Sequence, residues 1–288
     1  MRIESEIIKA LKPKFTQADE TLLDPVQQNA FHLRTSPPYF IKWIPENDTR
    51  GNNEIWVNQN ILANAKIPTP KLVCTAKTEN ATIICWEWLE GTDLRLQHRD
   101  KLPEAFALLG AFHAEYRCEK SGESLVTRRI YKSPGELIAA DLEFLCSLHD
   151  TNVYTLSKKI LKILEEGFPT YIHGDMHPGN IRSTRNGLKI VDWGYCQQSL
   201  NFFDLGYIQS EDLVTDGSDP WWNITPAETG KVLPGYYASC ELSHLDPYQV
   251  QHAVMLWSEL WSYSNAIKNG IHSGAEIAKQ NIARLIRS

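Results

Sequence analysis

The sequence predicts an α+β fold with two lobes, and three observations carry this prediction. The chain has 288 residues, which corresponds to about two domains or to one large domain with two lobes. Short runs of alternating apolar and polar residues fill the first third, which indicates strands. Beyond it, apolar residues recur at helical spacing. We therefore expect a small N-terminal lobe built on an antiparallel sheet and a larger, mostly helical C-terminal lobe.

The N-terminal lobe is expected to hold four strands around one helix. Residues 31–35 and 39–44 alternate in polarity on either side of a Pro-Pro turn, so they predict a hairpin. Apolar side chains near helical spacing predict a helix over 52–65, which ends before the next prolines. Strand patterns resume at 72–74 and 81–86.

The segment 89–93 breaks these patterns, and we place the boundary between the lobes there. The predicted domains are residues 1–88 and 89–288. In the second domain, a capping box with proline at the first helical position predicts a helix that starts at 133–136. A second helix is expected around 160–164, and a third at 250–261, where Val250, Val254, Trp257 and Trp261 share one face.

Composition and charge exclude several functional classes. Hydrophobic residues make up 42% and charged residues 22% of the chain, which is ordinary for a globular protein. The net charge is −6, and no dense run of Lys and Arg is present, so we expect no nucleic-acid partner. No apolar stretch approaches a membrane span, and the first residues lack the apolar core of a signal peptide. We expect a cytoplasmic protein with no membrane partner.

Six scattered cysteines form no Cys-x-x-Cys pair. This spacing argues against a structural zinc site and against a redox dithiol. We expect free, buried thiols.

The most informative stretch is His173-Gly174-Asp175-Met176-His177-Pro178-Gly179-Asn180, followed by an apolar run that ends at Asp192. It places acidic and amide side chains on two neighbouring loops. Phosphoryl transfer needs such groups, because it requires metal ligands, a carboxylate that orients the attacking hydroxyl and a cation on the phosphates.

These residues closely resemble the catalytic and metal loops of the aminoglycoside phosphotransferase and choline kinase family. Flanking features agree from about Phe31 to Tyr207, among them Lys42, Glu54 and 86–91. The resemblance implies a protein-kinase-like two-lobed fold, with a nucleotide-binding lobe at 1–88 and a catalytic and substrate-binding lobe at 89–288. It also implies transfer of the γ-phosphate of ATP or GTP, with Mg²⁺, to a hydroxyl of a small molecule.

The resemblance assigns a role to each matching residue. Asp175 is expected to be the catalytic residue that accepts or orients the proton of the acceptor hydroxyl. Asn180 and Asp192 are expected to bind Mg²⁺. Lys42 is expected to reach the nucleotide phosphates and Glu54 to pair with it, in preference to Glu46 in the preceding loop.

Glu87 and Trp88 fall where the family's hinge offers backbone hydrogen bonds to the base, with Trp86 behind that pocket. The alternative is a plain strand end and a core aromatic. His173 and His177 are expected to brace the catalytic loop.

His113 is expected to be a hydrogen-bonded core histidine, and Asp204 to tie the catalytic loop together. Both expectations come from positions that match the family.

The sequence departs from the kinase pattern at residues 23–30, where kinases have glycines that let the backbone close over the phosphates. No glycine occurs there, so the phosphate contacts would fall on Gln27, Gln28 or Asn29, or the grip on the nucleotide would be weaker.

The acceptor is expected to be small and cationic. Only eleven residues separate Asp192 from Asp204, too few for the long activation segment of a protein kinase. Carboxylates and indoles, which suit an amine or quaternary ammonium, occur together in the C-terminal region at Glu211, Asp212, Asp216, Asp219, Trp221 and Trp222.

The alternatives to a small-molecule kinase are a catalytically silent nucleotide- or ligand-binding protein and a nucleotidyl transferase. A monomer and a homodimer both remain open.

Overall fold

The computed structural model describes residues 3–95, 97–117, 151–206, 208 and 224–287. By its contacts the chain divides into two compact units, Met1–Asp93 with Ile181–Cys196, and Leu94–Asn180 with Gln197–Ser288. The chain therefore returns from the second unit to the first for residues 181–196 and then re-enters the second unit. The domain division at 88/89 stays a prediction.

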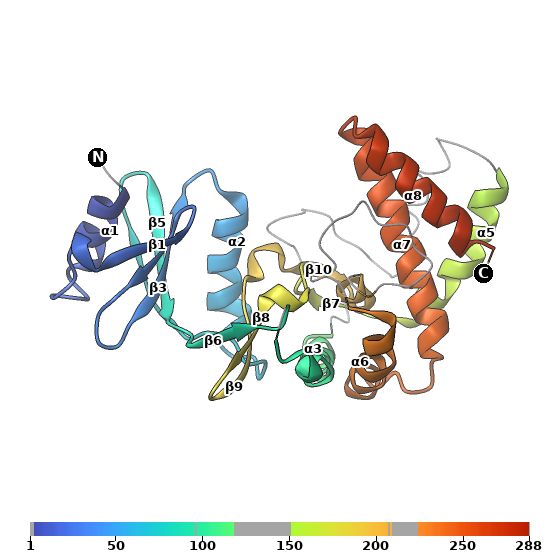
Figure 1. Ribbon diagram of the computed structural model, residues 1–288, viewed down its shortest axis with the longest axis horizontal. Coiled ribbons are helices and arrows are strands. Elements are labelled where there is room, and N and C mark those ends of the chain that lie inside the picture. The colour runs from blue at the N-terminus through green and yellow to red at the C-terminus, as the bar shows by residue number, and fades with distance from the viewer. Residues whose placement is uncertain (1–2, 96, 118–150, 207, 209–223, 288) are drawn as a thin grey trace. The chain divides into compact units, whose positions relative to one another are not determined.

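The first unit is built on a five-stranded antiparallel sheet with the strand order β1-β2-β3-β5-β4 (Figure 1). Its strands are β1 (Leu23–Gln27), β2 (Ala30–Leu33), β3 (Tyr39–Pro45), β4 (Leu72–Lys77) and β5 (Ala81–Glu87). Phe31 lies opposite Ile41, which confirms the predicted hairpin. The sequence pattern did not predict β1, because it contains Asp24 and Pro25; as an edge strand it tolerates both.

The two faces of this sheet carry different side chains, as the two-residue repeat of a strand requires. One face packs against α1 (Ile3–Leu11) in a core of apolar side chains that includes Ile7, Leu11, Leu33, Ile41, Ile83 and Cys85. The other face carries a smaller cluster of Ile44, Ile84 and Trp86. Lys42 is two residues from Ile44 and therefore shares this second face.

The helix α2 (Thr49–Val57) follows β3 and continues as a π-helical turn, Asn58–Leu62. It begins earlier than the predicted residue 52 because Asp48 caps it, accepting a hydrogen bond from the amide of Gly51 at 3.0 Å. Ile55 of α2 packs against the cluster on the second sheet face. This packing places Glu54 on the same side of the sheet as Lys42.

A second, three-stranded antiparallel sheet completes the first unit. It has the order β6-β8-β9, with β6 (Gly91–Asp93), β8 (Ile181–Thr184) and β9 (Gly187–Ile190). β9 ends just before Asp192, which adopts a left-handed conformation with φ 63° and ψ 59°. A non-glycine residue in this region marks a constrained turn.

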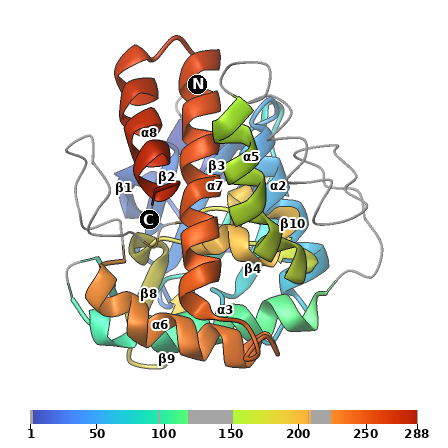
Figure 2. The same cartoon turned by 90° about the vertical axis from the view of Figure 1, so that its right-hand side faces the viewer.

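The second unit is mostly helical, as predicted (Figure 2). Its described elements are α3 (Leu102–Glu115), α5 (Thr151–Leu161), β7 (Pro169–Ile172), β10 (Gln197–Leu200), α6 (Pro226–Ser239), α7 (Pro247–Lys268) and α8 (His272–Leu285). β7 and β10 pair in antiparallel fashion. α3 packs against α6 so closely that a Cβ atom at Gly110 would come within 2.6 Å of the Tyr236 carbonyl oxygen. The helix predicted to start at 133–136 lies outside the described residues.

The predicted helix over 250–261 is part of α7, but its apolar stripe is shorter than expected. Val250, Val254 and Trp257 are buried, whereas Trp261 is 50% exposed. Helical pitch alone assigns Trp261 to the buried face, and the surrounding packing decides otherwise. No helix in the described part of the chain has the length and apolar character to cross a membrane.

The thiols of Cys74, Cys85, Cys196 and Cys240 are free and buried, as the sequence predicted. Cys118 and Cys146 lie outside the described residues.

Glu259 on α7 makes the stability of the protein depend on pH. Burial raises its pKa from 4.5 to about 7, although a hydrogen bond with Asn281 of α8 acts in the opposite direction and lowers the pKa. The folded state therefore favours the protonated carboxyl, which stabilises it at low pH, and this contribution is lost as the pH rises from about 4.5 through about 7.

We expect Glu259→Gln to be more stable than the wild type at about pH 8 by about 1–2 kcal/mol, with the difference shrinking towards about pH 5. Urea unfolding at both pH values measures this. A difference that does not change with pH would contradict the assignment.

Candidate active site

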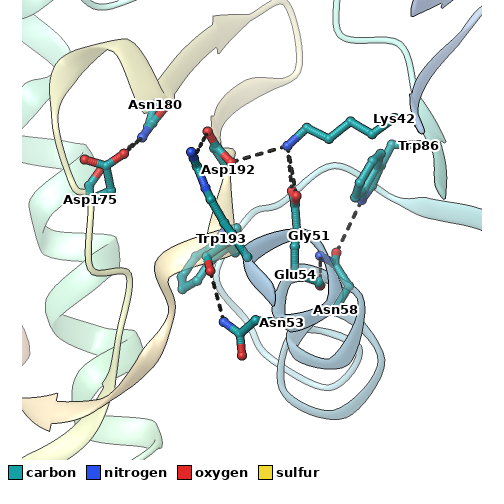
Figure 3. A network of polar contacts seen from close by, with 12 residues as sticks. Lys42, Gly51, Asn53, Glu54, Asn58, Trp86, Asp175, Asn180, Asp192 and Trp193 are labelled. Atoms are coloured by element: carbon teal, nitrogen blue, oxygen red, sulfur yellow. Dashed lines mark hydrogen bonds and ion pairs between the residues drawn. The ribbon is translucent and has the colours of Figure 1, made fainter. Parts of the chain in front are cut away.

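Lys42, in the middle of β3, contacts Glu54, as the resemblance implied, and it also contacts Asp192 (Figure 3). Its ammonium nitrogen lies 2.8 and 3.2 Å from the two carboxylate oxygens of Glu54 and 3.3 Å from Oδ1 of Asp192. The Glu54 side chain is only 7% exposed, whereas Glu46 is exposed. The structure therefore brings Lys42, Glu54 and Asp192 together within the first unit.

The charges of this group depend on one another. Burial disfavours the charge on Lys42, but the carboxylates of Glu54 and Asp192 outweigh it and hold the pKa of Lys42 above its ordinary value. An ammonium that stays charged at the edge of a buried site is suited to binding phosphate oxygens.

Arg50 is a fourth member of this group, and no pattern in the sequence predicted it. Its Nη2 atom lies 2.6 Å from Oδ2 of Asp192, so Asp192 has a cation on each carboxylate oxygen. The guanidinium carbon also lies 4.1 Å from the centre of the Tyr195 ring. Asn53, buried one turn along α2, donates to the carbonyl oxygens of Gly194 at 3.1 Å and of Cys196 at 2.8 Å.

A pocket of about 370 Å³ opens beside these side chains within the first unit. Its lining consists of the turn between β1 and β2, the middle of β3, the start of α2 and Asp192, namely Gln27, Gln28, Asn29, Ala30, Lys42, Trp43, Ile44, Asp48, Arg50, Gly51, Glu54 and Asp192. The turn that lacks glycine therefore faces the same space as the two cations. Asn29 takes the left-handed conformation there, with φ 59°, which asparagine tolerates better than most residues.

Asp175 and Asn180 lie together on a loop of the second unit (Figure 3). The side-chain nitrogen of Asn180 donates to the backbone oxygen of Asp175 at 2.9 Å and to its Oδ2 at 3.3 Å. His177 accepts from the amide of Gly179 through Nδ1 at 3.0 Å, and its Nε2 lies 3.7 Å from Oδ2 of Asp175. These contacts fix the direction of the Asp175 carboxylate, whose side chain is 19% exposed.

The base of this loop is held by Asp204. Its two carboxylate oxygens accept from the amides of His173 and Gly174, each at 2.7 Å. Gly174 has φ 81°, which glycine adopts without strain. His113, fully buried, contacts Asp204 through Nε2 at 3.1 Å and the Tyr236 hydroxyl through Nδ1 at 2.8 Å. The expectations that Asp204 ties the loop together and that His113 is a hydrogen-bonded core residue are confirmed.

His173 is also buried, and its Nδ1 accepts from the amide of Asp175 at 3.2 Å. It braces the loop backbone, as expected, and so does His177.

The phosphotransferase enzyme family (APH) matches residues 58–236 of the chain. This range covers more than half of the sequence and contains Asp175, Asn180 and Asp192. The chain belongs to this family. Lys42 and Glu54 precede the matched range, so their assignment depends on the structure of the first unit. At the level of sequence, no curated protein matches the chain.

Solved phosphotransferases share the fold. The GDP complex of wild-type aminoglycoside 2'-phosphotransferase-IIIa is 12% identical, with a TM-score of 0.63 over 99% of each chain. A thermostable mutant of aminoglycoside phosphotransferase APH(4)-Ia, in a ternary complex with ADP and hygromycin B, is 14% identical, with a TM-score of 0.62 over 100% of this chain and 98% of that one. Plasmodium vivax ethanolamine kinase is 13% identical, with a TM-score of 0.55 over 95% and 85%. The fold is therefore the kinase-like fold predicted from the sequence.

In this phosphotransferase, β5 ends at Glu87 and Trp88 follows it, and the backbone amides of both residues are hydrogen-bonded. The amide of Glu87 donates to the Lys71 carbonyl at 3.0 Å and that of Trp88 to the Pro38 carbonyl at 3.3 Å. The Trp88 ring stacks on His32 with centroids 3.8 Å apart. Both amides are already used, so a base held here would have to use other backbone atoms of the segment.

Trp86 behaves as a core aromatic that also borders the site. It is 5% exposed, and the Lys42 ammonium lies 5.7 Å from its ring centre. The acidic and tryptophan residues of 211–222, which are expected to contact the acceptor, lie outside the described part of the phosphotransferase.

Proposed function

We propose that this phosphotransferase moves the γ-phosphate of ATP or GTP to a hydroxyl of a small cationic acceptor. The observation that carries the proposal is the loop of Asp175 and Asn180. In a chain of this family, that loop presents a carboxylate whose direction is fixed by Asn180 and His177 and whose backbone is held by Asp204.

Asp175 is the proposed catalytic residue. The acceptor hydroxyl oxygen attacks the γ-phosphorus, the bond from that phosphorus to the bridging oxygen of the β-phosphate breaks, and the nucleoside diphosphate leaves. The hydroxyl proton passes to Asp175, which orients the hydroxyl before transfer. Lys42, kept charged by Glu54 and Asp192, would bind phosphate oxygens of the donor. Glu87 and Trp88 are the proposed contacts to the base.

Asn180 and Asp192 are the proposed Mg²⁺ ligands, and their donor atoms fit this ion. Mg²⁺ prefers carboxylate and other oxygen ligands. Since the Asn180 nitrogen is the atom that donates to Asp175, its amide oxygen is the atom that these bonds do not use. A bound Mg²⁺ would neutralise charge on the phosphate oxygens.

A cationic acceptor fits the charge of the chain, which is −6. The relatives of the same fold point the same way, since one is bound to hygromycin B and another is an ethanolamine kinase. Free thiols at four described cysteines suit the proposed cytoplasmic location. The protein is proposed to act as a monomer or homodimer, without nucleic-acid or membrane partners.

The test is Mg²⁺-dependent turnover of ATP and GTP by the purified protein across aminoglycosides, choline-like alcohols, sugars and amino alcohols. We expect at least one cationic alcohol to stimulate turnover and to gain the mass of one phosphoryl group. A gain of a whole nucleotidyl group would show a nucleotidyl transferase. Nucleotide binding without stimulation by any acceptor would favour the silent kinase, which the turn without glycine at 27–30 motivates.

A further inference from the structure

The pocket of the first unit contains a cation that the family pattern does not account for. Kinases surround the phosphates with amides of a glycine-rich loop. Here the corresponding turn is short and contains Gln28 and Asn29 instead of glycine, and the amide of Trp43 in β3 donates to the Asn29 carbonyl at 2.8 Å. A turn without glycine that is held to β3 adapts less to a phosphate chain than a glycine-rich loop does, so charged side chains that line the pocket become more important for binding phosphate.

Arg50 has the position for this role. It lies in the first turn of α2, four residues before Glu54 and so on the same helix face. Its side chain lines the same pocket as Lys42 and the turn, and it is 42% exposed. Lys42 and Arg50 thus approach the space under the turn from β3 and from α2.

The path of the Arg50 side chain is shaped by its neighbours. A Cβ atom at Gly194 would come within 2.7 Å of Cγ and 2.8 Å of Nε of Arg50, so any larger residue there would displace the arginine. The guanidinium plane is supported by the Tyr195 ring, 4.1 Å from the guanidinium carbon. This support pre-orients a planar group with several N–H donors, which binds phosphate in a bidentate way.

The charges indicate what Arg50 binds when the pocket is filled. Lys42 contacts Glu54 at 2.8 Å and Asp192 at 3.3 Å, and Arg50 contacts the other carboxylate oxygen of Asp192 at 2.6 Å. Asp192 is the proposed Mg²⁺ ligand. When its carboxylate serves a metal, a phosphate chain is the anion best able to replace it as partner of Arg50.

We propose that Arg50 binds the phosphate chain of the donor nucleotide and compensates for the missing glycine-rich loop. The proposal rests on the phosphotransfer function above and adds a residue to its donor site. According to the proposal, this pocket recognises the polyphosphate chain of the donor. The alternative is that Arg50 only positions Asp192.

The experiment compares Arg50→Gln and Arg50→Lys with the wild type by calorimetric titration. The ligands are ATP, adenosine and inorganic tripolyphosphate, each with and without Mg²⁺. Arg34→Gln is the matched control, because Arg34 lies in the same unit and pairs with Asp24 at 2.8 Å, and it does not line the pocket.

We expect Arg50→Gln to weaken ATP and tripolyphosphate binding by about 10- to 100-fold, as for the loss of charge-assisted hydrogen bonds. Arg50→Lys should fall between this variant and the wild type. Adenosine binding and the Arg34→Gln control should be unchanged. In kinetics with an acceptor, KM for ATP should rise more than kcat falls.

Unchanged tripolyphosphate affinity in Arg50→Gln in the presence of Mg²⁺ would overturn the proposal, and so would a wild type that binds no polyphosphate under the same conditions. A change confined to kcat and to the Mg²⁺ dependence would favour the positioning role. Binding is read without turnover, so failure of the phosphotransfer proposal and failure of this one are distinguishable. If Arg50→Gln does not fold, the graded loss in Arg50→Lys decides.

Discussion

Replacement of Asp175 by alanine is expected to lower acceptor-stimulated turnover by about 10²- to 10⁴-fold, the range for loss of a general base. The proposed function makes this carboxylate the group that orients the acceptor hydroxyl and takes its proton. Asn180 at 3.3 Å and His177 at 3.7 Å hold the carboxylate in one direction. No other side chain of the loop that the structure describes between His173 and Asn180 is a carboxylate.

Two comparisons separate a chemical effect from a structural one. Asp175→Asn keeps the size and one acceptor oxygen but not the basicity, so it should lose about as much turnover as Asp175→Ala. Nucleotide affinity should stay within a few-fold in both variants, because Asp175 is not assigned to the donor. Turnover within about tenfold of the wild type in both variants would remove Asp175 from the catalytic role.

Replacement of Asp204 by alanine is expected to lower the free energy of unfolding by about 3–5 kcal/mol, the cost of removing one partner from a buried charged network. The side chains of Asp204 and His113 are both fully buried. Loss of the Asp204 carboxylate leaves the backbone amides of His173 and Gly174 without their acceptors. Each buried polar group without a partner costs about 1–3 kcal/mol.

Urea unfolding measures this effect, with Asp100→Ala as the control. Asp100 is exposed in the same unit, and its replacement should change stability by less than about 0.5 kcal/mol. Asp204→Asn, which keeps one acceptor, should lie between the two. A loss of stability no larger in Asp204→Ala than in the control would contradict the role of Asp204 in holding the loop.

The loop of the second unit could be predicted closely from the sequence because most of its contacts are local. Asn180 reaches Asp175 over five residues, and His177 reaches Gly179 over two. Such contacts depend on the order of residues and on turn geometry. The hairpin of β2 and β3 and the helix α2 were predicted for the same reason, since the periods of two and 3.6 residues repeat within each segment.

Contacts between residues that are far apart in the sequence could be identified only from the tertiary structure. Lys42 and Asp192 are 150 residues apart, and Arg50 and Asp192 are 142 apart. The family pattern led to Lys42 and Asp192, but no local signal distinguished Arg50 from any other arginine in the first turn of a helix. Gly194, whose missing side chain makes room for Arg50, is 144 residues away in the chain, so its link to Arg50 appears only in the folded structure.

The two-part α+β fold, the family and the local arrangement of the Asp175 loop could be predicted from the sequence, because each depends on short repeats or on a motif of neighbouring residues. Three features became visible only in the folded protein: Asp192 lies between Lys42 and Arg50, the turn without glycine shares their pocket, and Trp261 is exposed. These features depend on which distant segments pack together, and packing across more than a hundred residues leaves no periodic signal in the chain.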